Sequence, residues 1–273
     1  MDQLITFVGG GNMATALIGG LIRYGTPAAR IHVADPSGEA RQKLHDHWPV
    51  RTFTAAEDAV AGADIVVLAV KPQVMPAVLP GLRGRFGGRP LIVSIAAGIT
   101  LETLHEGLGD DLPTVRCMPN APALTGEGVT AMVANGACGA EHRLLAERIL
   151  AAAGATEWLE DEALMDAVTA VSGSGPAYFF LLGETLAKAG EAMGLPADMA
   201  RRLALHTLHG SGVLATASDV DLAELRRRVT SPGGTTQAAL EVFDAGGFAD
   251  LVERAVRAAT ERGHALARGG EGS

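Results

Sequence analysis

Short apolar runs alternate with helical patterns through the first half of the chain. Such runs are typical of strands that are buried on both faces, and the amphipathic stretches between them indicate helices. The pattern predicts strands over residues 4–8, 31–34, 63–70, 90–95, 114–118 and 128–134. It predicts helices over 37–47 and 139–153, and a short helix capped by Thr100. Because strands that alternate with helices are joined by right-handed parallel crossovers, we expect a doubly wound α/β sheet.

The pattern changes near residues 158–162, and no strand is predicted after them. Every later segment has helical spacing, often with Ala and Leu along one face. These segments are 163–170, 176–193, 197–216, 222–229, 235–245 and 248–267. We therefore expect an α/β domain over 1–160, an all-helical domain over 161–268 and a disordered, Gly-rich tail over 269–273. The Ala- and Leu-rich helices also suggest a dimer that buries their apolar faces against a second copy.

The first predicted strand runs directly into a glycine-rich turn. Gly9, Gly11 and Ala14 form a G-x-G-x-x-A pattern between a strand and a helix. In that context Gly9 permits a tight turn, Gly11 lets the backbone approach a pyrophosphate, and Ala14 allows close packing of helix on strand. The pattern predicts a Rossmann-like dinucleotide site, and a purely structural glycine turn is the alternative.

The second predicted strand ends at Asp35, which is followed by Pro36 and Ser37. An acid at this position can accept hydrogen bonds from the adenine ribose hydroxyls, which favours NAD. Alternatively, the three residues form a turn with a helix cap. Arg41 and Lys43 lie close enough in sequence to meet a 2′-phosphate, so the choice between NAD and NADP stays open.

Three further segments follow strands at the carboxyl edge of the predicted sheet, where ligands bind in open α/β folds. Lys71 can meet an anionic ligand or a ribose hydroxyl, or it is simply a solvated loop residue. The small residues over 96–98 leave room for a nicotinamide ring. Asn120 lies in a Pro-flanked loop and can bond a carboxamide or the substrate.

Two hydroxyl- and glycine-rich stretches open helices in the second half of the chain, over 172–178 and 230–236. A turn of this kind presents free N–H groups that suit a carboxylate or phosphate. The alternative is an ordinary helix cap with close helix packing. The adjacent Gly233 and Gly234, with hydroxyls on both sides, make 230–236 the better candidate for anion binding.

Composition and charge argue against several classes of partner and cofactor. The 273 residues carry 22 Lys and Arg against 31 Asp and Glu, a net charge of −9, which argues against nucleic acid or an anionic membrane as the main partner. No signal peptide or membrane span is predicted, and the two cysteines suit a reducing compartment, so we expect a cytoplasmic protein. The scattered histidines form no ligand motif, and we predict no metal site.

Several motifs together resemble the pyrroline-5-carboxylate reductases of proline biosynthesis, and the resemblance covers almost the whole chain. The motifs are FVGGGNMA at 7–14, AVKPQ at 69–73, RCMPN at 116–120, DAVT at 166–169, SGSGPAY at 172–178 and VTSPGGTT at 229–236. The last is the specific one. The resemblance implies that NADPH or NADH reduces the cyclic imine 1-pyrroline-5-carboxylate to L-proline. It also implies a homodimer with interlocked helical domains, often assembled into a decamer of five dimers.

The resemblance assigns site residues by position. The implied cofactor-binding residues are Val8, Gly9, Gly10, Gly11, Asn12, Met13, Asp35, Ala69, Val70, Lys71, Pro72, Ile95, Ala96, Ala97 and Asn120. The implied substrate-binding residues are Glu162, Ser231, Gly233, Gly234, Thr235 and Thr236, with the cradle over 231–236 contributed by the partner chain. The hydroxyl of Thr236, the implied catalytic residue, would orient the imine nitrogen, and the substrate enters as the iminium or takes its proton through water.

The chain departs from the family pattern at two positions. Ala121 stands where Thr is common, and Arg228 stands where Asn is common. Relatives with Asp-Pro at 35–36 use NADPH, which favours NADPH here. Two rival functions remain. A β-hydroxyacid dehydrogenase would carry a catalytic Lys near the start of the helix that opens its second domain, but the first Lys of that helix here is Lys188, far from its start. A non-catalytic NADPH sensor would not need the 231–236 cradle.

Overall fold

A computed structural model of the chain describes residues 1–109 and 111–267. It divides into two compact units. The larger unit comprises Met1–Gly173 and the described residues from Ala259 onward, and the smaller unit comprises Ser174–Ala258. The sequence-based division near residue 160 stays a prediction, and the predicted tail over 269–273 lies outside the described residues.

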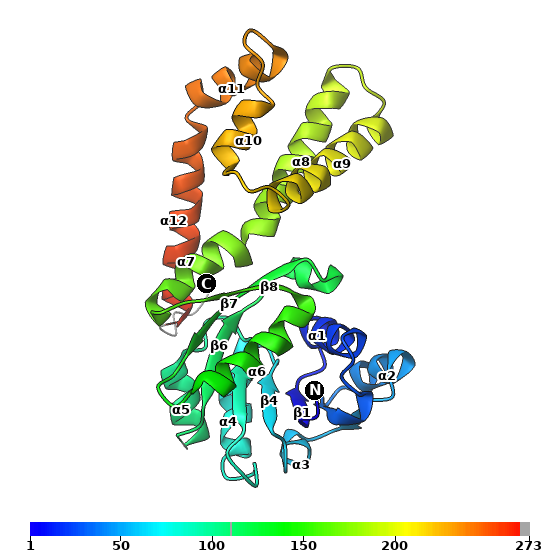
Figure 1. Ribbon diagram of the computed structural model, residues 1–273, viewed down its shortest axis with the longest axis vertical. Coiled ribbons are helices and arrows are strands. Elements are labelled where there is room, and N and C mark those ends of the chain that lie inside the picture. Colours follow the sequence, from blue (N-terminus) through cyan, green and yellow to red (C-terminus); the bar gives the residue numbers. More distant parts are fainter. Residues whose placement is uncertain (110, 268–273) are drawn as a thin grey trace. The chain divides into compact units, whose positions relative to one another are not determined.

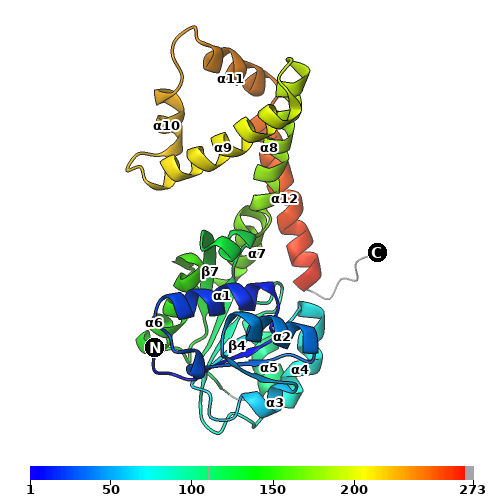
Figure 2. The ribbon, with the colours of Figure 1, turned by 90° about the vertical axis from the view of Figure 1, so that its right-hand side faces the viewer.

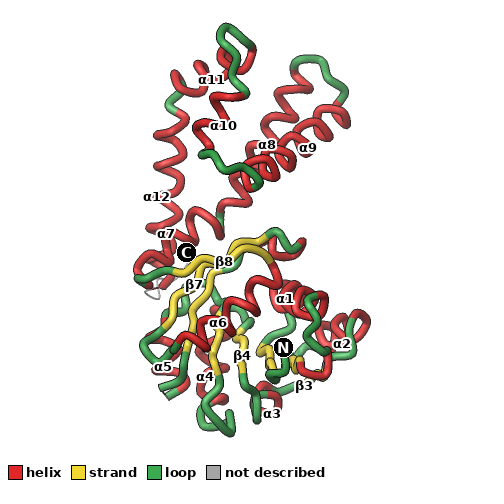
Figure 3. Tube along the Cα trace, viewed as in Figure 1, coloured by secondary structure: helices red, strands yellow, loops and turns green. Residues whose placement is uncertain are grey.

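The larger unit is built on one eight-stranded sheet with the strand order β3-β2-β1-β4-β5-β6-β7-β8 (Figures 1 and 3). Neighbouring strands run parallel, except that β7 is antiparallel to β6. The strands are β1 (Ile5–Val8), β2 (Ile31–Ala34), β3 (Arg51–Phe53), β4 (Ile65–Leu68), β5 (Leu91–Ser94), β6 (Thr114–Met118), β7 (Gly128–Ala134) and β8 (Gly154–Trp158). The predicted doubly wound, Rossmann-like fold class is confirmed.

Helices cover both faces of this sheet. One face packs against α1 (Asn12–Arg23), α2 (Gly38–His47) and α6 (Ala140–Leu150), and the opposite face against α3 (Ala56–Ala59), α4 (Met75–Leu82) and α5 (Leu101–Leu108). The central strands β1, β4 and β5 are buried along their whole length, as their continuous apolar sequences predict. Burial of each large aliphatic side chain contributes about 1.5–3 kcal/mol, so these two layers hold the carboxyl edge of the sheet in place.

The sequence pattern missed part of this unit and misjudged one strand direction. The expected parallel crossovers do not extend to β7, which turns back antiparallel to β6. β8 has no continuous apolar run because it is an edge strand whose exposure alternates along its length. α4 contains prolines at its start and interior, which obscures a helical pattern, and β3 has only three residues.

The smaller unit is entirely helical. It contains α8 (Gly175–Ala192), α9 (Ala197–Thr216), α10 (Leu222–Arg228), α11 (Thr235–Ala245) and the first part of α12 (Phe248–Ala267). α8 and α9 are joined by a short loop and pack against each other as a helical hairpin (Figures 1 and 2). Within residues 174–258, all of which are described, only Gly175, Ala200 and Ala204 are buried, while Phe180 and Leu181 are exposed. This unit therefore has no core of its own in a single chain.

The end of α12 belongs to the larger unit, where it packs beside α7 (Met165–Val168). The imidazole Nδ1 of His264 lies 2.7 Å from Oδ2 of Asp166, a carboxylate that is largely buried. None of the helices within the described residues is long and apolar enough to cross a membrane.

Candidate functional site

The glycine turn after β1 is pressed against the end of β4. Gly9 has a φ of +105°, and a Cβ built on it would lie 2.7 Å from the carbonyl oxygen of Ala69. Any other residue would therefore be strained by its backbone and would collide with the neighbouring strand. This contact joins two of the predicted cofactor-binding segments, 9–13 and 69–72.

The start of α1 presents free donors beside this turn. The first intrahelical bond runs from Thr15 N–H to the Gly11 carbonyl at 2.9 Å, so the N–H groups of Asn12, Met13 and Ala14 have no acceptor within the helix. Gly11 and Asn12 are exposed, and space is open where a Gly11 side chain would lie. The positive end of the helix dipole adds to these donors, so the turn suits a pyrophosphate.

Asp35 follows the last residue of β2, and its side chain hydrogen-bonds the same glycine turn. Its Oδ2 accepts a hydrogen bond from Gly10 N–H and its Oδ1 from Ser37 N–H, both at 2.8 Å. Ser37 in turn caps α2, since its hydroxyl accepts from Ala40 N–H at 3.2 Å. The carboxylate that could select a ribose is thus already bonded to two backbone amides.

Arg41 and Lys43 have different surroundings. The guanidinium of Arg41 is partly buried and donates to the carbonyl oxygen of Asp35 at 2.5 Å, which places it beside the end of β2. Lys43 is exposed and pairs with Glu39 at 2.9 Å on the same helix. Of the two cations predicted to meet a 2′-phosphate, only Arg41 contacts the predicted cofactor segment.

The other predicted cofactor segments meet at the carboxyl edge of β1, β4 and β5. Ala69 N–H donates to the Val8 carbonyl at 2.8 Å, and Ile95 N–H donates to the Leu68 carbonyl at 3.1 Å. Lys71 is exposed just beyond β4. This edge includes the position beside β1 where the strand order reverses, which is where ligands bind in such sheets.

The loop after β5 offers a small-residue surface. Ala96 is buried and packs into the core, whereas Ala97 is exposed at the edge. Ser94, directly before this loop, is buried, and its Oγ has no hydrogen-bond partner within the described residues. The buried positions fix the loop to the sheet and leave Ala97 facing outward.

Asn120 is buried and its side chain bridges two backbone segments. Its Oδ1 accepts from Val129 N–H at 3.0 Å, and its Nδ2 donates to the Ser172 carbonyl at 3.2 Å. These bonds hold the loop after β6. The contact with a carboxamide or substrate that the sequence suggests stays a prediction.

Glu162 lies in a polar cluster in the larger unit. Its Oε1 accepts from Arg116 Nη1 at 2.7 Å and from Leu101 N–H at 2.9 Å. Arg116 is a buried residue of β6, and Leu101 is the first residue of α5. Its predicted contact with the substrate stays a prediction.

In the smaller unit, the hydroxyl- and glycine-rich segment before α11 is exposed. Gly233 has a φ of +69°; its N–H donates to Gln237 Oε1 at 2.7 Å, and Gly234 N–H donates to the Ser231 carbonyl at 3.0 Å. The first intrahelical bond starts from Ala238, so the N–H groups at the first three positions of α11 have no acceptor within the helix. The glycines shape the turn, and the free donors belong to the residues that follow them.

The other such stretch, at 172–178, uses its first hydroxyl internally, since Ser172 Oγ donates to the Val168 carbonyl at 3.1 Å. The described residues contain no group of three or more His, Cys, Asp or Glu side chains that could hold a metal ion. Burial raises the pKa of the Cys117 thiol well above its usual range, which does not suit a nucleophile.

Sequence reasoning missed two residues that organise these segments. Arg116 enters the sequence analysis only within the motif RCMPN, although a cation inside the apolar run TVRCM indicates a buried ion pair. No motif marks Gln237, although a Gln at the third position of a helix commonly bonds a backbone N–H at the helix start; here it bonds Gly233, one residue before the cap.

Comparison with known proteins matches both units. Residues 162–266 match the family model described as pyrroline-5-carboxylate reductase dimerisation, and residues 4–98 match the model described as NADP oxidoreductase coenzyme F420-dependent. The chain is 50% identical over 263 residues to the pyrroline-5-carboxylate reductase of Pseudomonas aeruginosa, covering 96% of each chain. It is 42% identical over 261 residues to that of Haemophilus influenzae, covering 95% of this chain and 96% of the relative.

Solved structures agree with these matches. The structure of a pyrroline-5-carboxylate reductase from Coxiella burnetii matches with a TM-score of 0.94 at 36% identity, covering 97% of this chain and 99% of the other. The Plasmodium falciparum pyrroline carboxylate reductase, solved with NADP bound, matches with a TM-score of 0.84 at 29% identity, covering 97% and 98%. The chain therefore belongs to the pyrroline-5-carboxylate reductase family.

Proposed function

We propose that the protein reduces 1-pyrroline-5-carboxylate to L-proline with NADPH, and accepts NADH as an alternative donor. The observation that carries this proposal is its 50% identity to a reductase of that name along 96% of both chains. The larger unit supplies a dinucleotide-binding turn, and the smaller unit supplies an exposed set of free amides. Both features are what a reductase of an anionic imine requires.

The residues at the carboxyl edge of the sheet fit a dinucleotide. The free amides of Asn12 and Met13 would bind its pyrophosphate, and the small, outward-facing Ala97 would lie against the nicotinamide ring. When bound, NADPH supplies the hydride, and the protein supplies orientation and electrostatics. The hydroxyl of Ser37 and the guanidinium of Arg41 would meet the 2′-phosphate, which supports NADPH as the preferred donor.

The start of α11 fits the substrate carboxylate. The amides of Gly233 and Gly234 are already bonded within the turn, so we assign the carboxylate to the free amides of Thr235 and Thr236. The Ser231 hydroxyl lies in the same exposed segment and completes the cradle. In the assembled enzyme this cradle would come from the partner chain.

The hydroxyl of Thr236 would hydrogen-bond the ring nitrogen and orient the imine carbon for hydride attack. Reaction requires the imine carbon near van der Waals contact with the hydride donor, so orientation is a large part of catalysis. The substrate would enter as the iminium or receive its proton through water. Thr236 is therefore a positioning group for the nitrogen and not the source of the proton.

We further propose a homodimer built on α8–α12, and a decamer of five dimers. The family model for dimerisation covers these helices, and their apolar side chains are uncovered in one chain. Association of the smaller units would bury these faces. The cytoplasmic location expected from the sequence stays a prediction.

The test is a turnover assay that follows NADPH consumption with 1-pyrroline-5-carboxylate and is repeated with NADH. We expect rapid turnover with both donors and a higher kcat/KM with NADPH. A folded protein that binds NADPH but turns over no pyrroline carboxylate would contradict the proposal and favour the non-catalytic NADPH sensor.

A further inference from the structure

Arg116 is a cation buried inside the sheet. It lies on β6, and its side chain is 6% exposed, the lowest value for any charged group in the ion pairs of the described residues. A guanidinium cannot lose its proton in a protein, so the buried charge must be compensated by an anion. Glu162 provides that anion at 2.7 Å.

Glu162 makes a second contact with the same oxygen. Its Oε1 also accepts from the N–H of Leu101 at 2.9 Å. Leu101 is the first residue of α5, so this N–H has no acceptor within the helix, and a carboxylate there is favoured by the helix dipole. Asp161 caps the turn that carries Glu162, since its Oδ1 accepts from Ala163 N–H at 2.9 Å. The cap formed by Asp161 thus fixes the backbone turn that carries the Glu162 side chain.

The two contacts border the loop between β5 and α5. This loop runs over residues 95–100, and it carries the proposed nicotinamide surface at Ala97. Its first end leaves β5 at Ser94, which is paired in register with Arg116 on β6. Its second end enters α5 at Leu101. The Arg116–Glu162 pair therefore connects the strand beside one end of the loop to the helix at its other end.

We infer that Glu162 is a positioning residue for the nicotinamide-binding loop and not a ligand of the substrate. Arg116 holds the Glu162 carboxylate, and the carboxylate holds the first amide of α5, so the 95–100 loop keeps one conformation before the cofactor binds. This inference rests on the proposed function, because the loop is assigned to NADPH there. A preformed loop lowers the entropy lost on cofactor binding.

The competing role, a direct contact of Glu162 with substrate, has a different chemical consequence. The substrate carries a carboxylate, which the Glu162 anion would repel, so a direct contact could serve only its iminium nitrogen. Removal of Glu162 would then weaken binding of the imine and leave the loop unchanged. Removal of a loop support would instead weaken NADPH binding and loosen the loop in the absence of any ligand.

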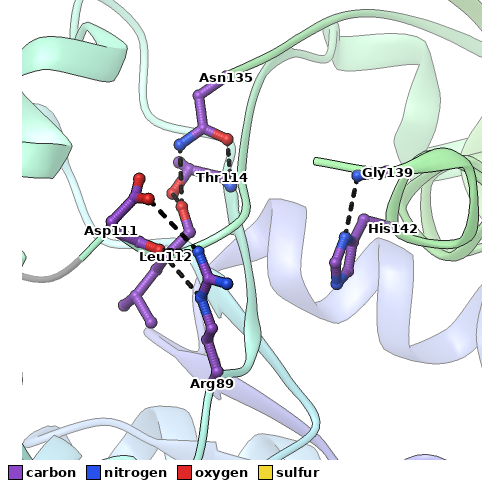
Figure 4. Close-up of polar contacts among 7 residues, drawn as sticks. All are labelled: Arg89, Asp111, Leu112, Thr114, Asn135, Gly139 and His142. Atoms are coloured by element: carbon purple, nitrogen blue, oxygen red, sulfur yellow. Dashed lines mark hydrogen bonds and ion pairs between the residues drawn. The ribbon is translucent and has the colours of Figure 1, made fainter. Parts of the chain in front are cut away.

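The experiment compares Glu162→Ala and Glu162→Gln with Asp111→Asn as the matched control. Asp111 pairs with Arg89 near the opposite, amino-terminal ends of β5 and β6, and its contacts are exposed (Figure 4). The measurements are NADPH affinity by fluorescence titration, amide hydrogen exchange over residues 95–104 without ligand, and KM for 1-pyrroline-5-carboxylate at saturating NADPH.

We expect Glu162→Ala to weaken NADPH binding about tenfold and to speed exchange over 95–104, with KM for the imine little changed. Glu162→Gln keeps an oxygen acceptor for Leu101 and should fall between Glu162→Ala and the wild type. Asp111→Asn should match the wild type in all three measurements. Should Glu162→Ala fail to fold, the double variant Arg116→Met/Glu162→Met removes both charges of the pair and should show the same loss of NADPH affinity.

An increase in KM for the imine, with NADPH affinity and loop exchange as in the wild type, would overturn the inference and make Glu162 a substrate ligand. If NADPH affinity and exchange change as expected but the wild-type protein turns over no pyrroline carboxylate, Glu162 keeps its positioning role and the proposed reaction fails. The ligand-free exchange measurement thus separates the two proposals.

Discussion

At the scale of single residues, the hydroxyl of Thr236 is the proposed contact with the imine nitrogen. Thr236 is exposed at the start of α11, beside the amides assigned to the substrate carboxylate. We expect Thr236→Ala to lower kcat about 10- to 100-fold, because a misoriented nitrogen reduces productive encounters, and Thr236→Ser to keep most activity. Steady-state kinetics at saturating substrate measures both, with Thr216→Ala, whose hydroxyl bonds its own helix, as the control. Unchanged turnover in Thr236→Ala would remove this role.

Asp35 has two possible roles that can be separated by experiment: support of the glycine turn, or selection of the cofactor through its ribose. Its carboxylate accepts from the N–H groups of Gly10 and Ser37. We expect Asp35→Ala to lower the free energy of unfolding by about 2 kcal/mol, since two amides lose their acceptor. Affinities for NADPH and NADH should fall by the same factor, because the whole glycine turn loosens. Thermal or denaturant unfolding and paired titrations measure this, and a selective loss of NADH affinity would show a ribose contact instead.

Arg41 carries the proposed preference for NADPH. Its guanidinium lies against the Asp35 carbonyl, whereas Lys43 on the same helix is paired with Glu39. We expect Arg41→Ala to raise KM for NADPH about tenfold and to leave KM for NADH nearly unchanged, because only NADPH carries the 2′-phosphate. Lys43→Ala is the matched control and should alter neither value. Equal losses for both cofactors in Arg41→Ala would instead indicate that this residue supports the turn.

The sequence predicted the glycine turn after β1, but it did not predict which polar side chains pair across the fold. Gly9 and Gly11 were predictable because the constraints on the turn are local, within a few residues of one strand end. The roles of Arg116 and Glu162 were not, because their bond joins residues 46 positions apart, and the bond from Leu101 spans 61 positions. Such contacts depend on which strands become neighbours, and no local pattern fixes that.

At the scale of elements, local periodicity predicted the buried strands because both faces of each are apolar. β8 and α4 were not found, since the first alternates at a sheet edge and the second contains prolines. The reversed direction of β7 was also unpredictable, because a strand has the same hydrophobic pattern in either direction. Most elements that carry the predicted site residues were among those found, but the short 3-10 turns Pro72–Val74 and Glu162–Leu164 were not.

α11 owes the shape of its first turn to Gln237. The side-chain oxygen of Gln237 accepts from Gly233 N–H, and its Nε2 donates to Glu241 at 2.8 Å. We expect Gln237→Leu to raise KM for 1-pyrroline-5-carboxylate about threefold to tenfold, because the left-handed Gly233 loses its support, while KM for NADPH stays unchanged. Steady-state kinetics with each substrate varied in turn measures this.

A second variant at the same position tests the electrostatics of the cradle. Gln237→Glu would place an anion beside the amides proposed for the substrate carboxylate, so KM should rise further than in Gln237→Leu, and added salt should reduce the difference. Gln42→Leu removes a similar exposed bond, to Asp46 at 2.8 Å, and should leave both KM values unchanged. A KM for the imine that is the same in all variants would place the carboxylate elsewhere.

At the scale of the whole molecule, the proposed cofactor site and the proposed substrate site lie in different units. The glycine turn and the β5–α5 loop lie in the larger unit, which has two extensive buried clusters. The proposed carboxylate cradle lies in the smaller unit, where only three residues are buried in a single chain. Cofactor binding should therefore depend on the larger unit of one chain, and imine reduction should depend on assembly as well.

This division predicts different outcomes for the two ligands when the dimer is broken. Phe180 and Leu181 on α8 are 65% and 63% exposed in one chain, an arrangement that favours association. We expect Phe180→Glu/Leu181→Glu to shift the protein toward monomer in light scattering, because two buried charges oppose association. Imine turnover should fall at least about tenfold, while the NADPH dissociation constant stays within about twofold of the wild type, a change of about 0.4 kcal/mol or less.

Tyr24→Glu provides the control for an added charge on an exposed aromatic surface. Tyr24 is 78% exposed at the end of α1 in the larger unit, away from α8 in sequence and outside the residues assigned to the cofactor. It should leave the mass in solution and turnover unchanged. A monomeric double variant with full turnover would show that each chain completes its own site. The cradle at 231–236 would then bind the substrate for the cofactor held by the glycine turn of the same chain. Loss of NADPH binding together with turnover would instead mean that the larger unit itself depends on the dimer.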